Sequence, residues 1–337
     1  MKNNCFVLLI LFQIFMSCSK SDALVLPIAQ TRYIISGTKI LNSGKSIQLI
    51  GVNTFHSFGV GSNDMVPWNL DIAREFIGNI KENPISGNPI QDSNGSWLHS
   101  LQSVVDGNRI NNKITIICAF GWDGTSPNLF TGTMPKQTVW WNDYKIKLQN
   151  WAIQFKNQPD VWIEVWNEPY RFDRTDGYTD AIWASDMNEM VANIRNTGNN
   201  NIVIVPCAEQ GQDESVLINK GISFLANKSN ILFDIHAYEK WLLATNSDIT
   251  TRLNNLESKN LPVFFGEIAP KNAGVLMNPQ FLLNELYNRG KTVCAWVWKY
   301  DQTDTDALLT TSYLPNNNNN NNWGSMYKEL ASRIRKP

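Results

Sequence analysis

Several apolar stretches of the sequence end in polar residues whose types suit the cleavage of a glycosidic bond. Glu168 and Glu267 each follow such a stretch, and so do His236 and Tyr238. A carboxylic acid that protonates a leaving oxygen and a second carboxylate that attacks carbon are the minimal machinery of retaining glycoside hydrolysis, with the two groups about 5 to 5.5 Å apart. Such a pair needs one carboxyl group protonated and the other ionised, which predicts a bell-shaped dependence of activity on pH.

Strands must bring these residues together, and the sequence alternates short apolar runs with helical stretches. The runs are residues 47–52, 113–120, 161–166, 202–205, 231–235, 262–265 and 293–298, with a weak second strand within 76–85; helical spacing occurs in 141–156, 181–195, 250–259 and 279–289. Nearly continuous apolar runs are typical of parallel strands covered on both faces. The alternation predicts an α/β fold, a (β/α)8 TIM barrel over residues 32–337, with a small hairpin at 33–41 closing the barrel base.

The composition limits the partners that the chain can have. Its 337 residues include 29 Lys and Arg against 30 Asp and Glu, and 43% are hydrophobic. This near-neutral charge offers no basic surface for nucleic acid or an anionic membrane. Cys118, Cys207 and Cys294 lie in or after strand-like runs and lack the spacing of metal ligands, so we expect no disulfide framework and no metal site. We expect a monomer.

The N-terminal residues are typical of an export signal. Residues 5–16 form a mostly apolar run that is too short to span a bilayer. Ser17 and Cys18 follow, and this order resembles a bacterial lipoprotein signal in which Cys18 becomes the lipidated first residue. Residues 19–31 would then be a tether, and the protein would be an envelope or outer-membrane lipoprotein whose only membrane attachment is this lipid. An ordinary signal peptide with an incidental Cys, and hence a secreted protein, is the alternative.

The order of the motifs resembles glycoside hydrolase family 5, the cellulase and mannanase family of clan A. The motifs are Asn167-Glu168-Pro169, His236-Ala237-Tyr238, Gly266-Glu267 and Trp296-Val297-Trp298, and the resemblance extends from residue 39 to residue 298. It implies that Glu168 is the acid/base, that Glu267 is the nucleophile and that no cofactor takes part.

The same resemblance implies roles for the neighbouring residues. Asn167 would bind the 2-hydroxyl of the sugar in the cleavage subsite, and Tyr238 would donate a hydrogen bond to Glu267 beside His236. We align Trp298, rather than Trp296, with the tryptophan that forms the floor of this subsite in the family.

Two residues of the family pattern are missing where the predicted strands end. Residues 79–85, at the end of the second predicted strand, contain no Arg, and Lys81 is the nearest cation. Residues 117–122, at the end of the third, contain no His, and His56 or His99 could fill that space. These departures concern the activation of Glu267 more than the fold.

The thirteen tryptophans are more than one core needs. The positions of Trp151, Trp162 and Trp183 suggest burial. Other tryptophans follow strand ends or precede helices and could either pack in the protein or stack on sugar rings: Trp68, Trp122, Trp140, Trp141 and Trp241. We include Trp122, Trp241 and His56 among the candidate substrate-binding residues.

The sequence as a whole predicts a retaining glycoside hydrolase that cleaves a β-linked polysaccharide or oligosaccharide. The expected substrate is a β-1,4-glucan or a β-mannan, cut internally by double displacement. One alternative is a glycan-binding protein on the same barrel that has lost catalysis, because two support residues are missing from the predicted strands. A hydrolase for another β-glycan, such as a β-1,3-glucan, is a further alternative.

Overall fold

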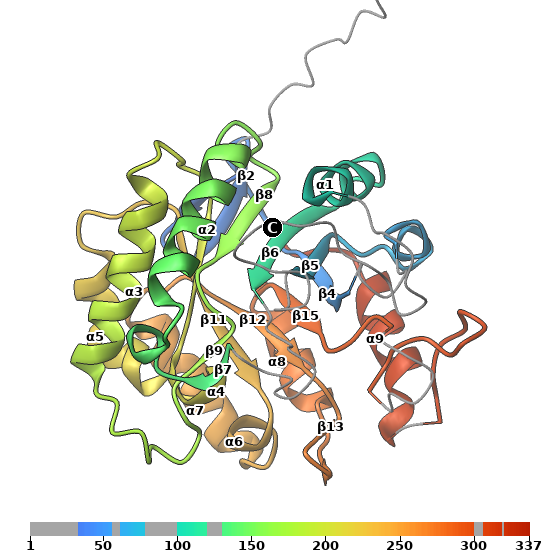
Figure 1. Ribbon diagram of the computed structural model, residues 1–337. Coiled ribbons are helices and arrows are strands. Elements are labelled where there is room, and N and C mark those ends of the chain that lie inside the picture. Colours follow the sequence, from blue (N-terminus) through green and yellow to red (C-terminus); the bar gives the residue numbers. More distant parts are fainter. Residues whose placement is uncertain (1–32, 56–60, 78–99, 120–129, 300–305, 319) are drawn as a thin grey trace, which may run out of the picture. The chain divides into compact units, whose positions relative to one another are not determined.

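A computed structural model of the chain describes residues 33–55, 61–77, 100–119, 130–299, 306–318 and 320–337 (Figure 1). The export signal with Cys18, the tether, Lys81 and Trp122 lie outside the described residues, as do His56 and His99. The assignments made for them remain predictions. No helix in the described ranges is long and apolar enough to cross a membrane.

Eight parallel strands form a closed barrel, which confirms the predicted fold class. The strands are β4 (Ile50–Thr54), β5 (Ile72–Ile77), β6 (Ile114–Ala119), β8 (Val161–Glu164), β10 (Val203–Pro206), β11 (Ile231–Ala237), β12 (Val263–Ile268) and β15 (Val293–Ala295). Each pairs in parallel with the next in chain order, and β15 closes the barrel against β4. The carboxyl ends of all eight strands therefore meet at one end of the barrel.

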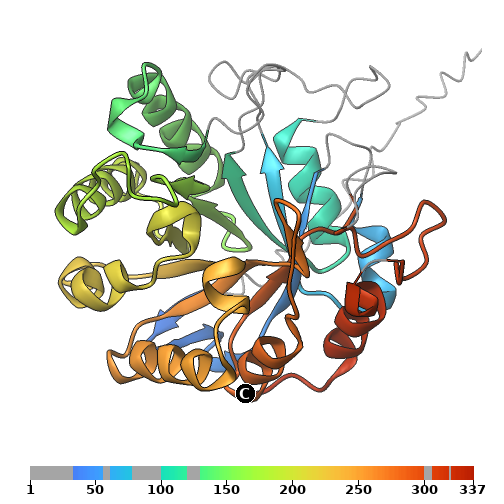
Figure 2. The ribbon, with the colours of Figure 1, turned by 90° about the horizontal axis from the view of Figure 1, so that it is seen from below.

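Helices follow the strands and cover the outside of the barrel (Figure 2). The longer ones are α1 (Leu101–Ile110), α2 (Trp141–Phe155), α3 (Asp180–Arg195), α5 (Ser215–Leu225), α7 (Asn246–Ser258), α8 (Gln280–Asn288) and α9 (Trp323–Ser332). The short ones are η2 (Asn63–Trp68), η4 (Pro135–Gln137), α4 (Ala208–Gly211), α6 (Glu239–Leu242) and η5 (Asn320–Asn322). Thr179 and Thr245 start α3 and α7 by accepting hydrogen bonds from the backbone N–H groups of Ile182 and Asp248.

A small antiparallel sheet packs against the amino-terminal end of the barrel. The predicted hairpin is present as β1 (Tyr33–Ser36) and β2 (Lys39–Asn42), and β3 (Lys45–Ile47) adds a third strand. Ile40 of this sheet belongs to the apolar cluster that fills the lower barrel, and the Tyr33 ring lies 5.7 Å from the Trp162 ring. The sheet thus closes the barrel base with apolar side chains.

The predicted position of the second strand is wrong. We expected it within residues 76–85, but β5 spans Ile72–Ile77. Two adjacent charged residues, Arg74 and Glu75, interrupt its apolar pattern, and both are fully buried. Arg74 pairs with buried carboxylates, and Glu75 accepts a hydrogen bond of 2.9 Å from Asn108 of α1. Because each charge has a partner on its own face of the strand, the segment can be buried without being apolar.

The barrel interior changes from apolar to charged along each of three strands. Side chains two residues apart on a strand point to the same face. Ile72, Trp162 and Leu232 belong to the lower apolar cluster, and the residues two positions later are Arg74, Glu164 and Asp234, all fully buried. The upper part of the barrel therefore holds a layer of charged side chains directly beneath the strand ends.

Candidate active site

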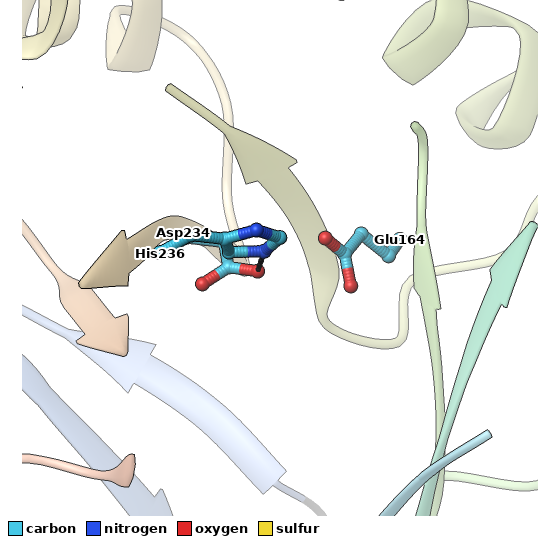
Figure 3. Close-up of side chains that lie close together, drawn as sticks. All are labelled: Glu164, Asp234 and His236. Atoms are coloured by element: carbon cyan, nitrogen blue, oxygen red, sulfur yellow. Dashed lines mark hydrogen bonds and ion pairs between the residues drawn. The ribbon is translucent and has the colours of Figure 1, made fainter. Parts of the chain in front are cut away.

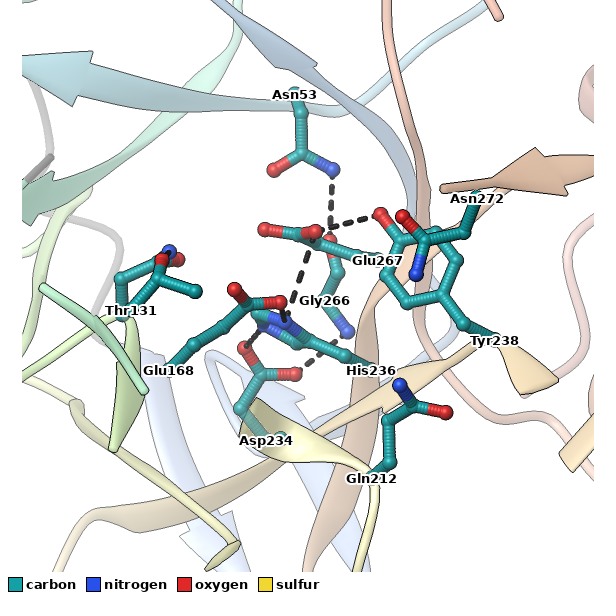
Figure 4. Close-up of polar contacts among 12 residues, drawn as sticks. Asn53, Thr131, Glu168, Gln212, Asp234, His236, Tyr238, Gly266, Glu267 and Asn272 are labelled. Atoms are coloured by element: carbon teal, nitrogen blue, oxygen red, sulfur yellow. Dashed lines mark hydrogen bonds and ion pairs between the residues drawn. The ribbon is translucent and has the colours of Figure 1, made fainter. Parts of the chain in front are cut away.

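Glu168 and Glu267 face each other at the carboxyl ends of the strands (Figure 4). Glu267 belongs to β12, and Glu168 belongs to β9 (Glu168–Pro169), a two-residue strand just beyond β8. A carboxylate oxygen of each lies within 4.8 Å of the other and of a ring nitrogen of His236. The structure thus brings the two predicted carboxylates into one site.

Both oxygens of Glu267 are held by hydrogen-bond donors. The Arg74 guanidinium donates from Nη1 to Oε1 over 2.8 Å, and the Tyr238 hydroxyl donates to Oε2 over 2.6 Å. Burial raises the pKa of Tyr238 well above its ordinary value, and the carboxylates of Glu267 and Glu168 add to this effect, so the hydroxyl keeps its proton. Tyr238 therefore lies where the sequence predicted it, with its hydroxyl on Glu267.

Arg74 supplies the cation that the sequence analysis reported as missing. Its Nε and Nη2 donate to the two oxygens of Glu164 over 2.7 and 2.9 Å, a bidentate pair. The same guanidinium donates to the side-chain oxygens of Asn53 and Asn167 over 2.7 and 3.0 Å. The Arg was missed because β5, the strand that carries it, begins earlier than predicted.

A short additional strand and His236 position Glu168. The strand β7 (Thr131–Thr133) pairs with β9, and the backbone N–H of Glu168 donates to the Phe130 carbonyl over 2.9 Å. The Glu168 carboxylate lies 2.9 Å from Nδ1 of His236. Its side chain is 15% exposed, against 4% for that of Glu267, so Glu168 is the more accessible of the two.

The buried charges shift the ionisation of the nucleophile candidate in opposing directions. Burial raises the pKa of Glu267, and the Glu168 carboxylate raises it further. The positive charges of His236 and Arg74 and the hydrogen bond from Tyr238 lower it, but they offset burial only in part, so the pKa of Glu267 stays above its ordinary value. The donors around Glu267 therefore favour the ionised form that an attacking carboxylate requires.

A cavity of about 180 Å³ opens onto both carboxylates. Its described lining residues are Thr131, Asn167, Glu168, Tyr238, Glu267, Lys271, Asn272, Ala273, Trp296 and Asp306. Lys271 and Asn272 form β13 of a small hairpin with β14 (Val275–Leu276) that follows β12. The cavity thus presents hydroxyl, amide and aromatic groups around the two acids, a lining that suits a sugar.

The prediction that Trp298, rather than Trp296, forms the floor of the cleavage subsite is wrong. Trp298 is fully buried, packs edge-on against Trp68 with ring centroids 5.0 Å apart, and does not line the cavity. Trp296, two residues earlier, is partly exposed and lines the cavity. The strand β15 ends at Ala295, so Trp296 is the first side chain beyond its end.

Trp241 does not bind sugar either, because it lies in the protein interior. It is fully buried, with the Arg252 guanidinium 3.7 Å from its ring centroid and the Phe265 ring packed against it. Trp68 and Trp141 are also buried, as are the three tryptophans for which burial was predicted: Trp151, Trp162 and Trp183. Trp140 is partly exposed and stacks on Trp166 with ring centroids 5.3 Å apart.

Glu164, Asp234 and His236 form a second cluster of side chains that can bind metals (Figure 3). One ligand-type atom from each lies within 4.8 Å of the others, a spacing that a metal ion could use. Arg74, however, already places a cation 2.7 Å from Glu164 and 3.6 Å from Asp234. The arrangement is therefore that of an ion-pair network around an Arg.

Sequence reasoning missed Arg74, Asn53 and Asp234. Asn53 lies on β4 and donates to the backbone carbonyls of Gly266 and Ala295 over 2.8 and 3.1 Å. Asp234 stands two residues before His236 on β11, hence on the same face. The available signal was this two-residue spacing: polar residues at every second position of an otherwise apolar strand point into the barrel near its upper end.

The chain is similar to known proteins in both sequence and fold. A family model described as Cellulase (glycosyl hydrolase family 5) matches residues 43–302. A mannan endo-1,4-beta-mannosidase of Cellvibrio japonicus is 22% identical over 318 residues, which cover 91% of this chain and 68% of that protein. The solved catalytic domain of a mannanase from Streptomyces sp. SirexAA-E has a TM-score of 0.70 at 15% identity, covering 99% of this chain and 98% of that one. A mannohexaose complex of the Thermomonospora fusca β-mannanase has a TM-score of 0.67 at 17% identity, with coverages of 87% and 95%. These structures share the barrel fold.

Proposed function

Since the chain belongs to glycosyl hydrolase family 5, and is thus a glycosyl hydrolase, we propose that it cleaves a β-1,4-mannan internally and with retention of configuration. Glu267 is the nucleophile and Glu168 the acid/base. One observation carries the proposal: the two carboxylates approach within 4.8 Å across a single cavity. Retaining enzymes hold their carboxyl groups about 5 to 5.5 Å apart, whereas inverting enzymes need about 6.5 to 9.5 Å to admit a water molecule.

The first step forms a covalent bond between the sugar and Glu267. An oxygen of Glu267 attacks the anomeric carbon while Glu168 transfers its proton to the departing glycosidic oxygen. Arg74 and Tyr238 each donate to one oxygen of Glu267, so the carboxylate is oriented before substrate arrives and its charge is stabilised. The first product leaves with the proton that Glu168 gave up.

The second step restores the enzyme. Glu168, now ionised, removes a proton from a water molecule as the water attacks the anomeric carbon and the bond to Glu267 breaks. His236 lies 2.9 Å from Glu168 and holds it in the same place for both proton transfers. The sugar regains its original configuration because each step inverts it once.

Asn167 is placed to bind the sugar during both steps. Its Oδ1 accepts from Arg74 and its Nδ2 lies 3.2 Å from the Thr131 hydroxyl, at the cavity wall. The amide N–H group is thereby turned toward the space that a sugar would occupy, where it can donate to a 2-hydroxyl. Trp296 supplies an aromatic face in the same cavity.

The proposal of mannan rests on the relatives, whose names specify this glycan. A β-1,4-glucan remains the second candidate, since the matched family model is named for cellulase. The idea of a barrel that has lost catalysis was based on missing support residues, and Arg74 now fills one of those places. A panel of mannan, glucomannan, β-1,4-glucan and β-1,3-glucan, with product lengths measured over time, would identify the substrate and distinguish internal from terminal cleavage.

The assignment of the two acids is tested by Glu267→Gln and Glu168→Gln. Each should lower kcat by about 10³-fold or more while polysaccharide binding persists, because each removes a group that reacts in the transition state. Glu285→Gln on α8, outside the site, is the matched control and should retain wild-type kcat. Near wild-type turnover by either site variant would refute the assignment.

Truncated variants separate the two roles. With an activated aryl glycoside and azide, Glu168→Ala should yield the β-glycosyl azide, because azide intercepts the covalent intermediate. Glu267→Ala should yield the α-glycosyl azide, because azide then attacks the substrate directly from the vacant face. The opposite pairing of variant and product would mean that the two roles are exchanged.

A further inference from the structure

Asp234 is a buried carboxylate that touches the supports of both reacting acids. Its Oδ2 lies 3.1 Å from Nε2 of His236, whose other ring nitrogen contacts Glu168. Its Oδ1 accepts a 2.6 Å hydrogen bond from the backbone N–H of Gly266, the residue directly before Glu267 (Figure 4). One side chain thus fixes the imidazole that meets the acid/base and the strand segment that presents the nucleophile.

The lack of a side chain at Gly266 makes room for the Asp234 carboxylate. A Cβ atom built at Gly266 would lie 2.2 and 2.4 Å from the two Asp234 carboxylate oxygens, closer than any real side chain allows. Only glycine lets the Asp234 carboxylate approach the backbone so closely. The pair of residues therefore specifies a particular position of the β11 carboxylate against β12.

Each ring nitrogen of His236 lies within hydrogen-bond distance of a carboxylate, Nδ1 of Glu168 and Nε2 of Asp234. Burial alone would lower the pKa of His236, but the charges of Glu267 and Asp234 and the hydrogen bonds from the ring to Asp234 and Glu168 raise it well above the ordinary value. Burial likewise opposes the ionisation of Asp234, and the charges of His236 and Arg74 outweigh it, so the pKa of Asp234 is lowered. The charged and titratable groups that face His236 are Arg74 on β5, Glu164 on β8, Glu168 on β9, Asp234 on β11 and Glu267 on β12.

We propose that Asp234 is a positioning residue that holds His236 as an imidazolium against Glu168 and holds, through Gly266, the backbone that carries Glu267. The inference rests on the proposed roles of Glu168 and Glu267, and it adds Asp234 as a residue that supports both. With Asp234 in place, Nε2–H of His236 donates to Asp234, and Nδ1–H faces Glu168. The imidazolium also lies 3.6 Å from Glu267, where its charge favours the ionised nucleophile.

The wild-type protein gives the first test. The chain contains three histidines, so the ¹⁵N imidazole signals can be assigned by single His substitutions at His56 and His99. Both ring nitrogens of His236 should stay protonated from pH 5.5 to about 7.5, above the ordinary pKa of about 6.5. A neutral His236 at pH 7 in the wild type overturns the proposal, and this readout does not depend on which residues are catalytic.

Asp234→Asn gives the second test, because it keeps the size of the side chain and removes its charge. One nitrogen of His236 should be deprotonated at pH 7, kcat should fall about 10²-fold or more, and the acidic limb of kcat/KM should move up by about one pH unit. Loss of the imidazolium removes a charge that lowers the pKa of Glu267, which explains the direction of this movement.

Asp186→Asn is the matched control for a buried carboxylate. Asp186 on α3 is buried and accepts a 3.0 Å hydrogen bond from the Tyr170 hydroxyl. Its variant should lose stability without moving the acidic limb or the His236 signals. An Asp234→Asn enzyme that behaves like this control would show a structural role alone and overturn the proposal. If Asp234→Asn does not fold, the ¹⁵N imidazole spectrum of the wild-type protein still tests the proposal, because it reports whether His236 is an imidazolium.

Discussion

The two ends of the barrel interior are made from the same strands but hold opposite kinds of side chain. At the lower end, Ile72, Trp162 and Leu232 pack with the base sheet in an apolar cluster. Two residues later on the same strands, Arg74, Glu164 and Asp234 are equally buried but charged. Burial alone therefore does not distinguish the two ends, although one supports the fold and the other supports the chemistry.

The apolar and the charged end of the barrel interior should respond differently to substitution. Apolar contacts are non-directional, so loss of one side chain removes its own burial and leaves its neighbours in place apart from a cavity. A buried charge depends on its partners, since an ion left alone away from water costs about 3 to 5 kcal/mol. Arg74 contacts Asn53, Glu164, Asn167 and Glu267 at once, so a single change there disturbs the whole upper layer.

Arg74→Met should have the largest effect of the changes that compare the two ends. It keeps an unbranched side chain of similar length but removes the guanidinium that binds the buried carboxyl groups of Glu164 and Glu267, which should cost about 3 to 5 kcal/mol of unfolding free energy. The orientation of Glu267 is lost as well, so kcat should fall about 10³-fold. Urea denaturation and steady-state kinetics measure the two effects.

Arg74→Lys is the control that separates charge from geometry. A Lys ammonium restores one positive charge but cannot form the bidentate pair with Glu164 while reaching Glu267. Arg74→Lys should regain much of the unfolding free energy that Arg74→Met loses, but little of the lost kcat. If Arg74→Met retains wild-type kcat, the upper layer is structural and the comparison between the two ends fails.

Trp162→Ala should destabilise the protein by a similar amount and leave the chemistry in place. Trp162 is fully buried in the lower cluster, and removal of such a side chain costs about 3 to 5 kcal/mol. Because it makes no contact with the reacting pair, kcat of the folded enzyme should stay within about threefold of wild type. A fall in kcat as large as that of Arg74→Met would mean that the two layers are coupled.

The sequence was sufficient to predict the barrel because most of its strands are continuous apolar runs with helical stretches between them. The predicted helix 141–156 is α2 (Trp141–Phe155), and the predicted 181–195 is α3 (Asp180–Arg195). The strand β5 was misplaced because Arg74 and Glu75 resemble surface residues in a single sequence. Their burial depends on partners from β8, β12 and α1, which only the folded chain brings together.

The candidate site was predictable where a motif stands at a strand end. Glu168, Glu267, Asn167, His236 and Tyr238 all converge as expected, since the barrel brings the ends of β8, β11 and β12 together. The choice between Trp296 and Trp298 depends instead on where β15 ends, which the sequence did not show. In a sequence pattern, residues two apart are equivalent if the chain stays extended, so the spacing alone could not separate the two tryptophans.

The smallest effect should be the pH dependence of stability, and it too distinguishes the two layers. Burial and the Asp234 carboxylate raise the pKa of Glu164 to about 8, against the pull of Arg74, and the pKa of His236 is also raised. In the unfolded chain these groups titrate near about 4.3 and 6.5, so between about pH 5 and 8 the folded state binds more protons than the unfolded state. Stability should therefore fall as pH rises, by about 1.4 kcal/mol per pH unit for each extra proton. The lowered pKa of Asp234 acts in the opposite sense, but below this range.

Glu164→Gln removes one titrating group and should flatten the curve of unfolding free energy against pH, whereas Trp162→Ala should lower the curve without changing its slope. If the unfolding free energy of Glu164→Gln changes with pH in parallel with that of the wild type, Glu164 does not titrate in this range. It is then ionised from about pH 5 to 8 as the partner of Arg74, and the charged layer of the barrel holds one more fixed negative charge.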